Sequence, residues 1–157
     1  MSLIVKVLIV VVVGIPALGI GAAYCAANLN RQRMAGNEAM AIGTLRAIVS
    51  AQMAYSTDCM GAYAPTLERL AARGLVDPSL GSDPVERAGY AVTLRGGAGA
   101  TEAAMNDSAC DGAVSSFDVI AVPIEPGSSG VRFFKADDAG DVVQATSATF
   151  AGATPLD

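Results

Sequence analysis

Residues 33–55 read RMAGNEAMAIGTLRAIVSAQMAY, and this stretch decides the fold. Its larger apolar side chains recur at steps of three and four residues, which is the spacing of one face of an α-helix. That face comprises Met34, Ala41, Ile42, Leu45, Ile48, Val49 and Tyr55, and the polar residues Glu38 and Gln52 recur at the same steps. We expect the charged side chains Arg33, Glu38 and Arg46 to stay in contact with water. The stretch therefore predicts an amphipathic helix whose apolar face needs a partner.

A long uncharged run precedes this helix, because residues 7–30 contain no Asp, Glu, Lys or Arg. A helix of about 20 apolar residues crosses the core of a bilayer, so we favour a retained transmembrane helix over residues 1–30. Two alternatives are a cleaved secretory signal and a lipid anchor on Cys25. No proline separates the run from residues 31–56. We therefore expect one helix of about 50 residues, membrane-embedded first and amphipathic afterwards.

The charges and the cysteines give opposite indications for topology. Arg31 and Arg33 follow the apolar run, and the positive-inside rule would place that side in the cytoplasm. Cys59 and Cys110 lie in the polar part of the chain, where they can pair in an oxidising compartment. The alternative is two free thiols in a cytosolic domain. We favour the disulfide, which closes a loop worth about 4 kcal/mol, and hence an extracytoplasmic domain.

Beyond the helix, the hydrophobic period changes to two, as in half-buried strands. A short helix is expected first, over residues 65–73, with Thr66 as its cap. The expected strands cover residues 90–94, 117–122, 131–135 and 142–145. Together they predict an α+β fold in which a roughly four-stranded antiparallel sheet packs on the second half of the long helix. The globular domain spans residues 57–145, and residues 146–157 form a loose tail.

The composition argues against several classes of function. A net charge of −5 and a pI near 4.6 disfavour nucleic-acid binding, which needs a basic surface. The chain has no histidine, so His-based triads and His-ligated zinc sites are excluded. Asp137, Asp138 and Asp141 form a weak calcium-loop candidate, for which a solvated turn is the alternative. We find no catalytic constellation and expect neither an enzyme nor a bound cofactor.

Several ordered motifs resemble type IV pilins and the related pseudopilins of type II secretion. The family's helix segment is matched at Asn37, Glu38, Gly43, Leu45, Arg46, Gln52 and Tyr55. Later matches are Gly61-Ala62-Tyr63, Gly74-Leu75-Val76-Asp77, Gly89-Tyr90, Ala121-Val122-Pro123 and Gly130-x-Arg132-x-Phe134-x-x-Asp137-x-x-Gly140-x-Val142. Cys59 and Cys110 also resemble the cysteine pair of some members. The resemblance covers about residues 31–145.

The resemblance implies a structural subunit of a pilus or a secretion pseudopilus, assembled through its apolar helix. Its partners would be the lipid bilayer and other copies or other pilin-like subunits, with no nucleic acid. The domain would lie in the periplasm, anchored in the inner membrane, or on a cell-surface filament. The sequence differs from the family pattern because neither a Gly-Phe pair nor an acidic residue precedes Glu38. The alternative is therefore a single-pass membrane protein that does not assemble and has a pilin-like binding or accessory domain.

Overall fold

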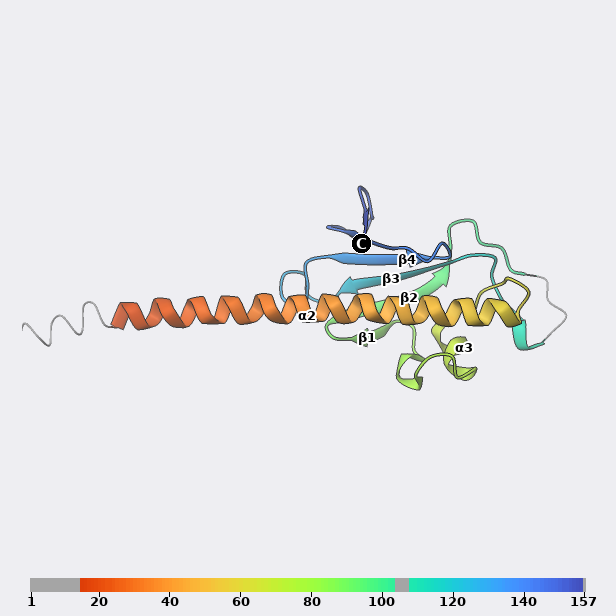
Figure 1. The fold of residues 1–157 in the computed structure, drawn as a ribbon, viewed down its shortest axis with the longest axis horizontal. Helices are drawn as coiled ribbons and strands as arrows, with labels where there is room; N and C mark the ends of the chain where they lie inside the picture. Colours follow the sequence, from red (N-terminus) through yellow and green to blue (C-terminus); the bar gives the residue numbers. More distant parts are fainter. Residues whose placement is uncertain (1–14, 104–107, 157) are drawn as a thin grey trace, which may run out of the picture.

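A single long helix organises the molecule. The computed structural model describes residues 15–103 and 108–156, with side chains from residue 28 onward. Helix α2 (Ile15–Asp58) runs for 44 residues without interruption. Figure 1 shows that its C-terminal half lies along the sheet, while its N-terminal half projects beyond the globular domain. The expected continuity between the end of the apolar run and the amphipathic stretch is therefore confirmed over the described residues.

The sheet packed on α2 is antiparallel and has six strands in sequential order. The strands are β1 (Val85–Arg87), β2 (Tyr90–Gly96), β3 (Phe117–Pro123), β4 (Phe133–Asp137), β5 (Val142–Ala145) and β6 (Thr154–Pro155). The expectation of about four strands is wrong. Strands β2 to β5 correspond to the four expected ones, whereas β1 and β6 have three and two residues. Strands that short carry no measurable alternation. Strand β6 lies in the tail that we expected to be loose, and it pairs with β5.

The core lies between α2 and one face of the sheet, since α2 contacts β2, β3, β4 and β5. Helix residues Leu45, Ile48 and Tyr55 are fully buried. The sheet supplies alternate residues of its central strands: Tyr90, Val92, Leu94, Phe117, Val119, Ala121, Phe134 and Ala136. Among them, Tyr90, Val92 and Leu94 are the alternating positions expected from the sequence, whereas Ala136 lies beyond the strand expected over residues 131–135. The apolar face of the helix, with its spacing of three and four residues, packs on the apolar face of the sheet, with its spacing of two. This packing gives the α+β class.

Short helices fill the connection between α2 and the sheet. Helix α3 (Leu67–Ala72) buries Leu67 and Leu70, and its cap is Thr66, whose hydroxyl accepts the Arg69 N–H at 3.3 Å. This cap was expected from the sequence. The 3₁₀ turn η2 (Pro78–Leu80) lies in the same connection and carries Leu80 into the core. A further 3₁₀ turn, η3 (Ser108–Cys110), lies between β2 and β3 and carries Cys110 into the core.

The described residues contain no helix with an apolar stretch long enough to span a membrane. Residues 7–14, where the apolar run of the sequence begins, lie outside the described residues.

Candidate functional site

The first candidate element is a polar clamp between α2 and the β3–β4 loop (residues 124–132). Glu38 Oε1 accepts the backbone N–H groups of Val131 at 2.9 Å and Arg132 at 3.2 Å. Glu38 Oε2 accepts Arg132 Nε at 2.8 Å and lies 2.6 Å from Nη2. Asn37, the residue before Glu38, donates from Nδ2 to the carbonyl of Ser129 at 2.8 Å. Two adjacent helix residues thus fasten a loop more than 90 residues away in sequence.

The Arg132 guanidinium extends the clamp to the sheet. Its Nη1 donates to Gln144 Oε1 on β5 at 2.7 Å. The Tyr90 hydroxyl donates to the Arg132 carbonyl at 2.8 Å. Gly130 lies directly against that ring, because a Cβ built on Gly130 would overlap the Tyr90 hydroxyl. Glycine is therefore required here for close approach and not for its backbone angle. The loop, the helix and two strands meet in one network.

Glu38 corrects one of our expectations. We expected it to remain in water, but the residue is only 6% exposed. Burial by itself raises the pKa of a carboxyl, yet hydrogen bonds from Val131 and Arg132 outweigh burial and hold the pKa of Glu38 below its ordinary value of 4.5. Its carboxylate is charged at neutral pH and is neutralised by Arg132. Arg33 and Arg46 are exposed, as expected.

A second buried polar contact lies toward the other end of α2. Gln52 is fully buried, and its amide exchanges two hydrogen bonds with the backbone of Ala64, at 2.9 Å from Nε2 and 2.8 Å to Oε1. Tyr55 is also fully buried, with the Arg73 guanidinium 4.8 Å from its ring centre. Leu45 belongs to the core between the two contacts. These family-motif positions are therefore structural in this domain.

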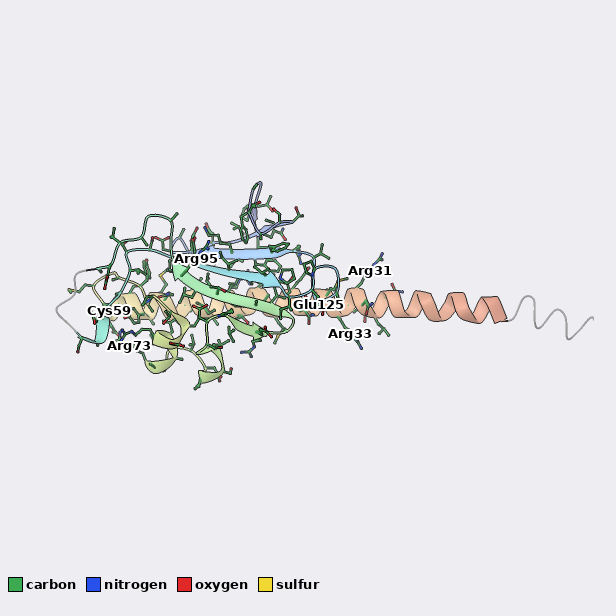
Figure 2. All side chains as sticks on the ribbon, turned by 180° about the vertical axis from the view of Figure 1, so that it is seen from behind. Arg31, Arg33, Cys59, Arg73, Arg95 and Glu125 are labelled. Atoms are coloured by element: carbon green, nitrogen blue, oxygen red, sulfur yellow. A yellow bond between two sulfur atoms is a disulfide. The ribbon has the colours of Figure 1, made fainter. Side chains whose placement is uncertain are left out.

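The predicted disulfide is present at the far end of the domain. Cys59 and Cys110 are bonded, with their Cα atoms 5.7 Å apart. Arg73 Nη1 lies 3.2 Å from Cys59 Sγ, and Nη2 lies 3.8 Å from Asp58 Oδ2. Figure 2 shows Cys59 and Arg73 together at the end opposite to the projecting helix. The bond joins the C-terminal end of α2 to η3, so it closes the domain at that end.

The second candidate element is the face of α2 that the sheet leaves uncovered. It carries small exposed side chains at steps of three and four residues, flanked by the larger exposed side chains of Met40, Arg46 and Met53. We call the small positions the small-residue face: Gly36, Ala39, Gly43, Ala47, Ser50 and Ala54. A hollow of about 330 Å³ opens beside it, between Met40 and Gly43 on α2 and Leu80 and Arg87 on neighbouring segments. Met40 is 50% exposed, and an added Cβ on Gly43 would meet nothing within 4 Å. Small residues at this spacing let a second helix approach closely.

The calcium-loop candidate gains no structural support. Asp137 Oδ1 accepts the backbone N–H of Ala139 at 3.1 Å, which is an ordinary turn contact. Asp138 and Asp141 are exposed. No group of three or more Cys, Asp or Glu residues among those described is arranged to hold a metal ion.

Sequence reasoning missed the partners of Glu38. Arg132 and Gln144 were not singled out for any role, although Arg132 belongs to the family-like motif that opens with Gly130. The only signal was that motif, because nothing local at Arg132 shows which carboxylate it meets. The structure brings Asn37 and Glu38 together with Arg132, and it places Gly43 and Arg46 apart from them on the exposed side of α2.

Taken together, the described side chains provide clamps and packing surfaces. Comparison with protein-family models, with curated proteins and with solved structures gave no match for this chain.

Proposed function

We propose that this protein is a pilin-like structural subunit of a type IV pilus or a type II secretion pseudopilus. The first half of its long helix would lie in the inner membrane or in a filament core. Its domain would lie in the periplasm or on the filament surface. The observation that carries the proposal is the division of α2, whose C-terminal half is buried by the sheet on one side and offers the small-residue face on the other. A helix with that division can serve its own domain and a neighbouring helix at once.

The small-residue face supports contact with other copies or with other pilin-like subunits. Six small residues leave the backbone of α2 accessible, and the adjoining hollow has room for larger side chains of a neighbour. In lipid, small residues at helix spacing favour association through close packing. The uncharged run over residues 7–30 would continue the same contact N-terminally. The disulfide agrees with a domain that matures in an oxidising compartment.

One observation favours the alternative of a membrane protein that does not assemble. No acidic residue precedes Glu38 in the sequence, and Glu38 itself is paired with Arg132 inside the domain. In pilins, an early acidic residue is thought to pair with the N-terminus of a neighbour in the filament core. Here the first carboxylate along the chain has an internal partner, so assembly would depend on packing alone.

The two functions are distinguished by where the native protein is found. Cells producing the wild-type chain are sheared, and the intact mass is measured in the sheared material and in the membranes under non-reducing conditions. A structural subunit is expected in both fractions. A protein found only in membranes would overturn assembly and favour the accessory function.

A matched pair of variants tests the surface itself. Gly43→Leu fills the exposed face next to the hollow, whereas Ala98→Leu places the same leucine side chain in an exposed loop away from α2. If α2 packs on a neighbour through this face, the Gly43→Leu protein is absent from the sheared fraction, whereas the Ala98→Leu protein is still found there. Formation of the Cys59–Cys110 bond in both variants, measured by mass, shows that each has folded. Equal behaviour of the two variants would contradict packing through the small-residue face.

A further inference from the structure

The charges of the chain are divided along its long axis. Residues 1–37 contain the basic residues Lys6, Arg31 and Arg33 and no acidic residue, whereas all 15 acidic residues lie from Glu38 onward. Figure 2 shows Arg31 and Arg33 on the part of α2 that leaves the domain. Both are exposed, and neither makes an ion pair with a described residue. The acidic turn between β4 and β5 lies at the other end, since β4 runs away from the β3–β4 loop.

Exposed apolar side chains lie at the same end as these arginines. We call this the helix-exit end: residues 29–33 of α2 and the β3–β4 loop, which the clamp fastens to Asn37 and Glu38. Leu29 is 55% exposed on the helix, and Ile124 and Val131 are 46% and 53% exposed in the loop. Glu125 lies at this end as well and is the acidic residue of the loop (Figure 2). Basic and apolar side chains together form the kind of surface that binds a lipid–water interface.

The spacing along α2 agrees with such a contact. The uncharged run ends at Asn30, and Arg31 follows. The headgroup layer on each side of a bilayer is roughly 5–7 Å thick. At about 1.5 Å per helical residue, that layer would cover the residues from Arg31 to about Ala35. The clamp at Asn37 and Glu38 then holds the β3–β4 loop at the outer edge of the headgroup layer.

We propose that the helix-exit end docks on the surface of a bilayer containing anionic phospholipid. Arg31 and Arg33 contact the headgroup phosphates, and Ile124 and Val131 enter the edge of the interface. Because the rest of the chain is acidic, an anionic surface attracts this end and repels the far end, so docking also orients the domain. This inference rests on the proposed membrane anchoring and adds a lipid class and a contact surface to it.

The test uses the absence of tryptophan from the chain. Full-length Val131→Trp, with Ile124→Trp as a second reporter, is reconstituted in phosphatidylcholine vesicles with or without phosphatidylglycerol, in which a small fraction of the phosphatidylcholine carries a nitroxide quencher on its headgroup. Met60→Trp is the control, because Met60 is 81% exposed and follows Cys59 at the far end. We expect quenching of the two loop reporters in anionic vesicles and little quenching of the control. Arg31→Gln with Arg33→Gln should reduce the docked fraction by on the order of tenfold.

Three results would overturn the inference, and each contradicts a different part of it. Loop reporters quenched no more than Met60→Trp, in protein that resists alkaline extraction, would refute docking and leave anchoring intact. Quenching that is equal in both vesicles and unchanged in the double Gln variant would refute the role of anionic lipid. Protein that alkaline extraction releases from the vesicles would refute the anchoring itself.

Discussion

Replacing Glu38 by glutamine tests whether the polar clamp stabilises the domain. The glutamine Oε1 can still accept the N–H groups of Val131 and Arg132. Its amide nitrogen, however, would face the Arg132 guanidinium, so that two donors meet where a carboxylate stood. The variant therefore loses the ion pair at 2.6 Å while keeping the size and the position of the side chain.

The magnitude follows from the burial of the two partners. A hydrogen bond to a charged group is worth about 1.5–3 kcal/mol, and breaking a fully buried ion pair costs about 3–5 kcal/mol. Arg132 has a side chain that is 41% exposed and keeps its contact with Gln144, so water can solvate it after the change. We therefore expect a loss of about 2 kcal/mol at pH 7. For a chain of this size that corresponds to a melting temperature about 6–8 °C lower.

The assay is thermal unfolding of the full chain in detergent micelles, followed by near-ultraviolet circular dichroism of the buried tyrosines. Glu125→Gln is the matched control, since it makes the same substitution at an exposed position of the loop that the clamp fastens. The control should change the melting temperature by less than about 2 °C, as surface substitutions do. Loss of the same stability in Arg132→Gln, without a further loss in the double variant, would show that the two residues act as a pair.

The direction of the pKa shift of Glu38 determines how its contribution to stability changes with pH. The folded-state pKa of Glu38 is lowered below 4.5, because hydrogen bonds from Val131 and Arg132 outweigh burial. The charged carboxylate therefore stabilises the fold fully above its ordinary pKa, and this contribution disappears as the pH falls through the lower, folded value. Wild type and Glu38→Gln should differ by a constant amount at pH values well above 4.5, and the difference should shrink as the pH falls below 4.5 and through the lower, folded value. A variant as stable as Glu125→Gln at pH 7 would refute the clamp.

Four further substitutions have defined outcomes. Gln52→Leu should cost about 3 kcal/mol in urea unfolding, because it leaves the buried N–H and carbonyl of Ala64 without partners; a loss below about 1 kcal/mol would mean that water replaces the amide. Cys110→Ser should cost about 4 kcal/mol for the opened loop, given a separation of 51 residues. If loss of the bond accounts for the whole effect, reduced wild type should unfold at the same urea concentration as Cys110→Ser. Gly130→Ala should cost about 1–3 kcal/mol by forcing Tyr90 to move, whereas Gly36→Ala, which meets nothing within 4 Å, should stabilise α2 by up to about 1 kcal/mol; similar results for the two glycines would contradict the close approach at Gly130.

The elements with long periodic patterns were predictable. Helix α2 and strand β2 repeat their apolar spacing several times, and Thr66 indicates the start of α3 because threonine is a good helix cap. Strands β3 to β5 were expected from short apolar runs bounded by turn residues. Strands β1 and β6 were missed, because three and two residues cannot show a period and their pairing depends on neighbours already in place. Their existence is a property of the assembled sheet edge and not of their own residues.

The candidate site was predictable only where the residue types alone indicate which side chains pair, as two cysteines do. Two cysteines in the polar part of the chain indicated the disulfide. Glu38 was assigned to water, since a lone carboxylate on a helix is usually solvated. Its burial depends on Arg132, which is 94 residues away. The small-residue face was likewise undefined until the sheet covered the other side of α2.

The clamp at Glu38 and the small-residue face are therefore expected to affect self-association in different ways. Glu38 is neutralised within its own domain, so its substitution should alter self-association only by destabilising the fold. The small-residue face contributes nothing to the core, so Gly43→Leu should alter self-association without destabilising the fold, and the lost glycine should even favour the helix slightly. If instead Glu38→Gln abolishes assembly in protein that remains folded, the clamp must open when subunits meet. The internal ion pair would then be a resting state of the subunit, and a neighbour would compete with Arg132 for the same carboxylate.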